Sequence, residues 1–167
     1  MQNTAKIALG VISSGKGREE KLDKMLASIH EHVDAIYVTL TSPTNETEGA
    51  ENVCKKYNAT ISHYPSKYKV TAEDVAWLKE FMGWEPMVQE GDKLFIFDDA
   101  RNYNLQQIPK EYDWYLWLDD DDFFMYPEKI RGVITQAVQS NVEAIYMNYI
   151  YQADIVDHHI THRVIEH

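Results

Sequence analysis

The chain has 167 residues, 44% of them hydrophobic, and its 27 aspartates and glutamates outnumber 16 lysines and arginines, giving a formal charge of −11. This length and apolar content predict one folded domain over residues 1–167 and exclude disorder by composition. The negative charge disfavours binding to nucleic acid or anionic membranes, and no apolar run is long enough to span a membrane. The single cysteine, Cys54, gives no sign of an oxidising compartment, so we expect a cytoplasmic protein.

The first half of the chain alternates predicted strands and helices. Residues 7–12 form a short apolar run that ends at a glycine-containing turn, as in a buried strand, and apolar residues at spacings of three and four predict a helix over 18–32. A second strand is expected over 35–40, a second helix over 46–57 and a third strand over 60–64. Because right-handed crossovers make such strands parallel, the expected class is α/β with a mostly parallel central sheet.

The second half is less regular before residue 98. The expected elements are a helix over 70–82, a loop over 83–91, strands over 93–97 and 114–118, a helix over 100–107 between them, a helix after Pro127, and strands over 143–151 and 160–165.

Four consecutive aspartates, Asp119–Asp122, follow the predicted strand over 114–118. Ligands of open α/β sheets bind outside the carboxyl ends of the strands, so a site is expected at this position. Adjacent carboxylates repel one another, and a divalent cation would relieve that repulsion. Oxygen ligands without cysteine suit Mg²⁺ or Mn²⁺. The alternative is an exposed acidic loop that precedes a helix N-terminus, where negative charge is favourable.

Three segments resemble, in order, the signature of family-2 nucleotide-sugar glycosyltransferases, which have the GT-A fold, a Rossmann-like α/β/α sandwich. Residues 100–102 (Ala-Arg-Asn) and the run 113–122 are similar to the family's "ARN … DWxLWLDADE" pattern. Residues 22–64 are similar to the strands, helices and turn that open the family's domain. The resemblance covers residues 7–150 except for an insert around 65–92.

The resemblance implies a hexosyltransferase-like enzyme that moves a sugar from a nucleoside-diphosphate sugar to an acceptor hydroxyl with inversion, using Mn²⁺ or Mg²⁺ held by a DXD motif. The acceptor, whether glycan, lipid or protein, is not identified. Carried over position by position, the donor-binding candidates are Ser13, Ser14, Arg101, Asp119 and Asp120, and the metal-binding candidates are Asp121 and Asp119.

A histidine-rich segment near the C-terminus supplies a further candidate metal ligand, His159, because imidazole also binds Mn²⁺. An exposed polar terminus is the alternative for this segment. In the insert, Trp84 could stack on a sugar ring or belong to the core.

The chain also departs from the family pattern. Leu40 stands where the family usually has an aspartate that reads the nucleobase. No general base is assigned, although Asp154, Asp157 and Glu166 are available. Two alternatives therefore stay open: a non-catalytic domain that binds a nucleotide sugar or a partner protein, and another metal-dependent enzyme such as a nucleotidyltransferase or phosphotransferase.

Overall fold

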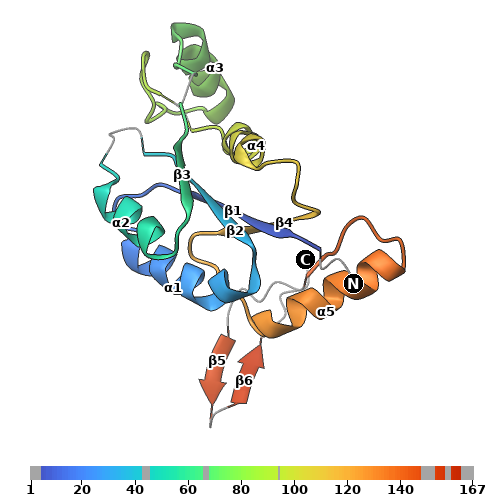
Figure 1. The fold of residues 1–167 in the computed structure, drawn as a ribbon. Coiled ribbons are helices and arrows are strands. Elements are labelled where there is room, and N and C mark those ends of the chain that lie inside the picture. The colour runs from blue at the N-terminus through green and yellow to red at the C-terminus, as the bar shows by residue number, and fades with distance from the viewer. Residues whose placement is uncertain are drawn as a thin grey trace.

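The computed structural model describes residues 5–42, 46–65, 68–93 and 95–147 and two further short strands near the C-terminus. Its central sheet has four strands in the order β3-β2-β1-β4, and every neighbouring pair is parallel (Figure 1). These strands are β1 (Ile7–Ser13), β2 (Ala35–Leu40), β3 (Thr60–His63) and β4 (Trp114–Asp119). The predicted α/β class with a parallel central sheet is therefore confirmed, and the arrangement is consistent with a Rossmann-like GT-A fold.

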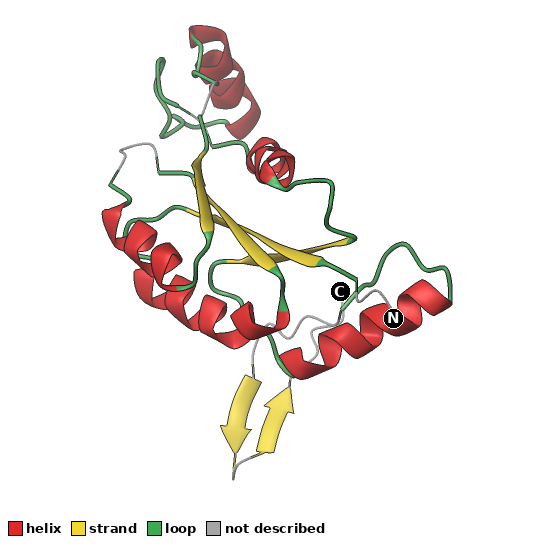
Figure 2. Cartoon of the chain, in the orientation of Figure 1, coloured by secondary structure: helices red, strands yellow, loops and turns green. Residues whose placement is uncertain are grey.

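Helices lie on both sides of the strands, with α1 and α2 on one side and α4 on the other (Figure 2). The helices are α1 (Glu19–Ile29), α2 (Glu48–Lys56), α3 (Ala72–Met82), α4 (Phe97–Gln107) and α5 (Ile130–Gln139), with 3₁₀ turns η1 (His30–His32) and η2 (Pro127–Lys129). Each predicted helix is present, and each begins or ends within a few residues of its expected bounds.

The hydrophobic core lies between the sheet and α1. All seven residues of β1 are buried, as expected for a short apolar strand that is covered on both faces. Leu22 and Leu26 on α1 and Ile134 on α5 join the strand residues in one cluster. Beside this layer, β1 and β4 pair directly, so their carboxyl ends lie together at one edge of the sheet.

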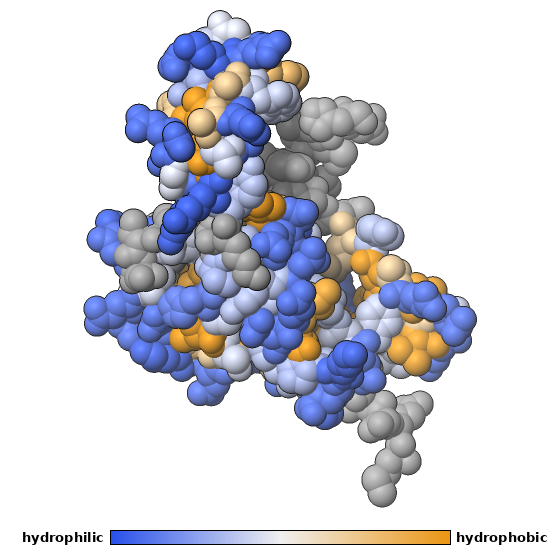
Figure 3. Space-filling model, turned by 90° about the horizontal axis from the view of Figure 1, so that it is seen from above, coloured by the Kyte–Doolittle hydropathy of each residue, from blue (hydrophilic) through white to orange (hydrophobic). Residues whose placement is uncertain are grey.

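The predicted insert around 65–92 contains α3, which has no buried residue. Thr71 and Asp74 form a capping box that satisfies the first backbone N–H groups of the helix. Seen from above in Figure 3, apolar side chains gather among hydrophilic ones over the part of the molecule that carries α3. The sequence leaves two alternatives for Trp84, a place in the core or stacking on a sugar ring. Its side chain is 57% exposed, so Trp84 is not a core residue.

One strand prediction is wrong, and a second fails over the residues that the structure describes. In place of a strand over 93–97, Lys93 makes only an isolated bridge with Lys69, and Phe97 already begins α4. Two aspartates in the first turn favour this earlier helix start, because they complement the helix dipole. The strand expected over 143–151 is absent over 143–147, where Ile145 packs on the core without pairing, and residues 148–151 lie outside the described residues.

Near the C-terminus the structure has an antiparallel pair of strands, β5 (Ala153–Val156) and β6 (His159–His162), separate from the central sheet. The prediction of a strand over 160–165 is met in its first three residues, and the rest lies outside the described residues. Within the part of the chain that is described, no helix is long and apolar enough to cross a membrane.

Candidate functional site

The acidic run lies where two parallel strands end together. β1 and β4 are direct neighbours, and their register pairs Ile12 with Asp119. The residues that follow, Ser13 on one strand and Asp120 on the other, therefore meet at the carboxyl edge of the sheet. This is the position at which open α/β sheets bind ligands.

Asp120 joins the ends of the two strands. Its side chain is only 7% exposed, and its Oδ2 accepts a hydrogen bond of 2.5 Å from Ser13 Oγ. Arg18 Nε lies 3.1 Å from both carboxylate oxygens, and Arg18 Nη2 also donates to Oδ1. Ser13 Oγ in turn accepts from the amide of Gly15, whose φ of 86° favours glycine. A buried carboxylate needs such partners, and here they come from the turn between β1 and α1.

Asp121 is the outermost carboxylate of this network. Its side chain is 44% exposed, and its Oδ2 lies 3.0 Å from Arg18 Nη2 and 3.3 Å from Lys21 Nζ. Burial acts to raise the pKa of Asp121, but hydrogen bonds from Arg18 and Lys21 outweigh burial and hold this pKa below its usual value. The Arg18 pKa is raised, chiefly by its hydrogen bond with Asp120.

Asp119 pairs with Arg101, the arginine that the sequence predicted at the site. Arg101 Nη2 lies 3.1 Å from Asp119 Oδ1, and the guanidinium lies over the rings of Phe97 and Trp117. Burial raises the pKa of Asp119, an effect that Arg101 opposes, and burial lowers the pKa of Arg101. Arg101 Nε is buried and has no hydrogen-bond partner. Buried donors without a partner are rare in folded proteins, so this nitrogen marks Arg101 as an unusual residue of the cluster.

Asp122 closes the acidic turn. Its Oδ2 accepts a 2.7 Å hydrogen bond from the amide of Asp119, and its own amide donates to the Asp119 carbonyl at 3.1 Å. The four carboxylates thus have distinct surroundings. One is buried and paired, one is exposed beside two cations, one is paired with Arg101, and one shapes the backbone.

The sequence analysis also singled out Ser14, Leu40 and His159. Ser14 is exposed, and its carbonyl accepts from the Lys16 amide. Leu40 is buried at the end of β2. His159 belongs to β6, whose side chains lie outside the description, so the proposed His159 ligand is not placed relative to the aspartates.

Sequence reasoning missed three residues that organise the site. Arg18 and Lys21 fall within the helix predicted over 18–32 and were not among the candidate site residues, yet they are cations of the acidic network. Asn104, one turn after Arg101 on α4, is buried and donates from Nδ2 to the carbonyls of Val11 and Tyr37. Because most residues of α4 are polar, the sequence pattern does not distinguish the buried Asn104, which faces the sheet, from the exposed polar residues of the same helix.

The carboxylate chemistry suits Mg²⁺ or Mn²⁺, but the described residues contain no group of three His, Cys, Asp or Glu side chains that could hold a metal ion. Three cations, Arg18, Lys21 and Arg101, already relieve the repulsion that suggested a metal. Asp121, the exposed carboxylate, is the residue that fits a cation best, because Mg²⁺ is often bound by one or two carboxylates while substrate phosphates and water complete its shell.

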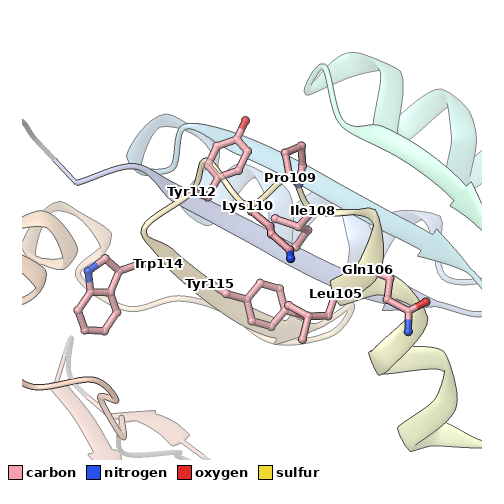
Figure 4. Close-up of a pocket in the computed structure, with 8 residues that line it drawn as sticks. All are labelled: Leu105, Gln106, Ile108, Pro109, Lys110, Tyr112, Trp114 and Tyr115. Carbon is pink, nitrogen blue, oxygen red and sulfur yellow. The ribbon is translucent and has the colours of Figure 1, made fainter.

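A groove of about 440 Å³ lies at the opposite end of β4 from the acidic run (Figure 4). It is lined by the last turn of α4, the loop after it and the first residues of β4: Leu105, Gln106, Ile108, Pro109, Lys110, Tyr112, Trp114 and Tyr115. The groove contains none of the predicted site residues.

No family model and no curated protein match the chain. Among solved structures, the chain is similar to the crystal structure of S. aureus TarS 1-349, with a TM-score of 0.48 and 12% sequence identity. The match covers 89% of this chain and 40% of that one, so the chain spans less than half the length of the structure it matches. A likeness at this level assigns no function, which is therefore inferred from the chain's own residues.

Proposed function

We propose that this chain is the donor-binding domain of a glycosyltransferase and that it transfers a sugar from a nucleoside-diphosphate sugar to an acceptor hydroxyl. The observation that carries the proposal is the acidic run Asp119–Asp122 at the carboxyl end of β4, directly beside the end of β1. Arg101 supports it, since a partly buried guanidinium, whose Nε has no hydrogen-bond partner, lies against Asp119.

The surroundings of each residue suggest a division of labour. Asp121, exposed at the rim, would hold Mn²⁺ or Mg²⁺ together with the phosphates of the donor. Such an ion, when bound, would stabilise the charge that develops on the departing nucleoside diphosphate. Arg101 would bind the phosphates of the donor through the exposed part of its guanidinium, while Asp119 keeps this group in place. Asp120 is occupied by Ser13 and Arg18, so we assign it to holding the two loops together.

Two binding and product measurements test this proposal. Calorimetric titration with a panel of nucleoside diphosphates and their sugars, with Mn²⁺ or with EDTA, should show binding of one nucleobase series that weakens when the metal is chelated. Incubation with the sugar that binds should release nucleoside diphosphate. Release of pyrophosphate would instead indicate a nucleotidyltransferase, and absence of binding by every donor would refute donor recognition.

A non-catalytic donor-binding domain is the second candidate. Leu40, which is buried, occupies the position of the base-reading aspartate. No general base is assigned, and the available carboxylates Asp154, Asp157 and Glu166 lie where the structure describes no side chains. Binding of a donor without turnover by any acceptor or by water would favour this candidate over the transferase.

A further inference from the structure

We infer that Arg18 is a positioning residue, which fixes the acidic loop after β4 against the glycine turn after β1 and so sets where Asp121 stands relative to a nucleoside-diphosphate donor. The inference rests on the proposed function for the nature of the donor. The positioning itself is a property of the chain and can be measured without a ligand.

The geometry shows one guanidinium connecting two successive carboxylates. Arg18 Nε contacts both oxygens of Asp120 at 3.1 Å, while Nη2 reaches Asp120 and also lies 3.0 Å from Asp121 Oδ2. The planar, forked donor set of arginine allows this double contact, whereas a lysine ammonium acts as a point charge. Arg18 therefore determines the orientation of Asp121 as well as the pairing of Asp120.

The position of Arg18 in the fold explains why it can do this. It stands at the N-cap of α1, and α1 is anchored in the core by buried residues such as Leu22 and Met25. A guanidinium that starts from this rigid helix reaches the end of β4, about 100 positions later in the sequence. Ser13 adds a second connection from the end of β1.

A purely structural ion pair is the competing explanation, and Arg131 provides a matched control for it. Arg131 Nη2 lies 3.0 Å from Asp34 Oδ1 and joins α5 to the segment before β2. This second arginine pair also connects distant elements, but it is remote in the fold from the acidic loop. Arg18→Met and Arg131→Met should both lower the unfolding temperature, and only the former should disturb the acidic loop.

Amide hydrogen exchange gives the readout that needs no donor. In Arg18→Met, exchange at the Asp122 amide, which donates to the Asp119 carbonyl, should accelerate at least several-fold beyond any change in α5, and Arg131→Met should leave it unchanged. Affinity for a nucleoside diphosphate with Mn²⁺ should fall roughly 10-fold to 100-fold in Arg18→Met, as is typical when an outer partner of a ligand-binding carboxylate is lost. Unchanged Asp122 exchange in Arg18→Met would overturn the inference.

Arg18→Met leaves the buried Asp120 carboxylate without its cation, so it is also paired with Asp120→Asn, which removes the unpaired charge. The double variant should recover stability while the Asp122 amide still exchanges fast. Recovery of the slow exchange together with stability would show that the pair is only structural. If the wild-type chain binds no nucleoside diphosphate, the proposed function fails, and the exchange result still decides the role of Arg18. Equal donor affinity in wild type and Arg18→Met would overturn the role of Arg18 and leave the proposed function intact.

Discussion

Replacement of Asn104 by alanine should loosen the helix that carries Arg101. Asn104 is 1% exposed, and its Nδ2 lies 3.2 Å from the Val11 carbonyl, 3.0 Å from the Tyr37 carbonyl and 2.8 Å from Thr39 Oγ1. Its Oδ1 accepts from the Tyr115 hydroxyl at 3.3 Å. One amide thus connects α4 to β1, β2 and β4.

The magnitude follows from the groups that lose a partner. Thr39 Oγ1 keeps its contact with Ser62, but the Tyr115 hydroxyl loses the acceptor and the two strand carbonyls lose a donor. An unsatisfied buried polar group costs about 1–3 kcal/mol, and the small cavity adds to it. We therefore expect Asn104→Ala to lower the free energy of unfolding by about 2–4 kcal/mol, a large part of the roughly 5–15 kcal/mol typical of a domain.

Urea unfolding at neutral pH, followed by far-ultraviolet circular dichroism, measures this change. Asn102→Ala is the control, because it removes the same side chain from an exposed position of the same helix and should change stability by less than about 0.5 kcal/mol. A loss in Asn104→Ala no larger than in Asn102→Ala would refute the view that this amide fastens α4 to the sheet.

Two further predictions concern charge and pH. Lys21 and Arg18 both contact Asp121 Oδ2, so Lys21→Met removes a positive charge that competes with a metal ion and should tighten Mn²⁺ binding by roughly twofold to fivefold, the equivalent of one exposed ion pair. Electron spin resonance titration with Mn²⁺ alone measures this affinity, and weaker binding in Lys21→Met would contradict the prediction. Burial raises the pKa of the Cys54 thiol from 9 to about 11 and that of the buried Tyr37 from 10 to about 12. The stability that these neutral groups contribute is complete below pH 9 and is lost as the pH rises towards 11 and 12. The free energy of unfolding in urea should therefore fall above pH 9, and it should fall less steeply in Cys54→Ala. A free energy of unfolding that stays constant up to pH 11 would disprove this prediction.

The regular part of the fold was predictable because burial and periodicity agree there. Short apolar runs predict the buried strands β1 and β2, and apolar residues at spacings of three and four predict the helix α1, whose apolar side is buried. The strand expected over 93–97 failed because two aspartates that favour a helix start outweighed a short apolar run. The strand expected over 143–151 failed over its described residues because Ile145 meets the core without a partner strand.

The proximity of the candidate residues was predictable, whereas most of their side-chain partners were not. Strand order and the acidic run place Asp119–Asp122 beside Ser13, and Arg101 was found through a motif. The pairing of Asp120 with Arg18 could not be predicted, because it joins residues about 100 positions apart through side-chain geometry that no sequence spacing encodes. Repulsion among the aspartates suggested a metal, whereas the structure shows that three basic side chains already balance much of that charge.

The most direct test of the proposed donor site is a titration of the isotope-labelled chain with nucleoside diphosphates and Mg²⁺, followed by two-dimensional nuclear magnetic resonance. Donor binding at the carboxyl ends of β1 and β4 predicts that the amides of Gly15 and Asp119–Asp122 and the Nε–H signal of Arg101 shift together and saturate at one affinity. Signals of the groove at the other end of β4, such as Tyr112, should stay in place. Shifts confined to that groove, or no shifts with any nucleoside diphosphate, would contradict the proposed donor site.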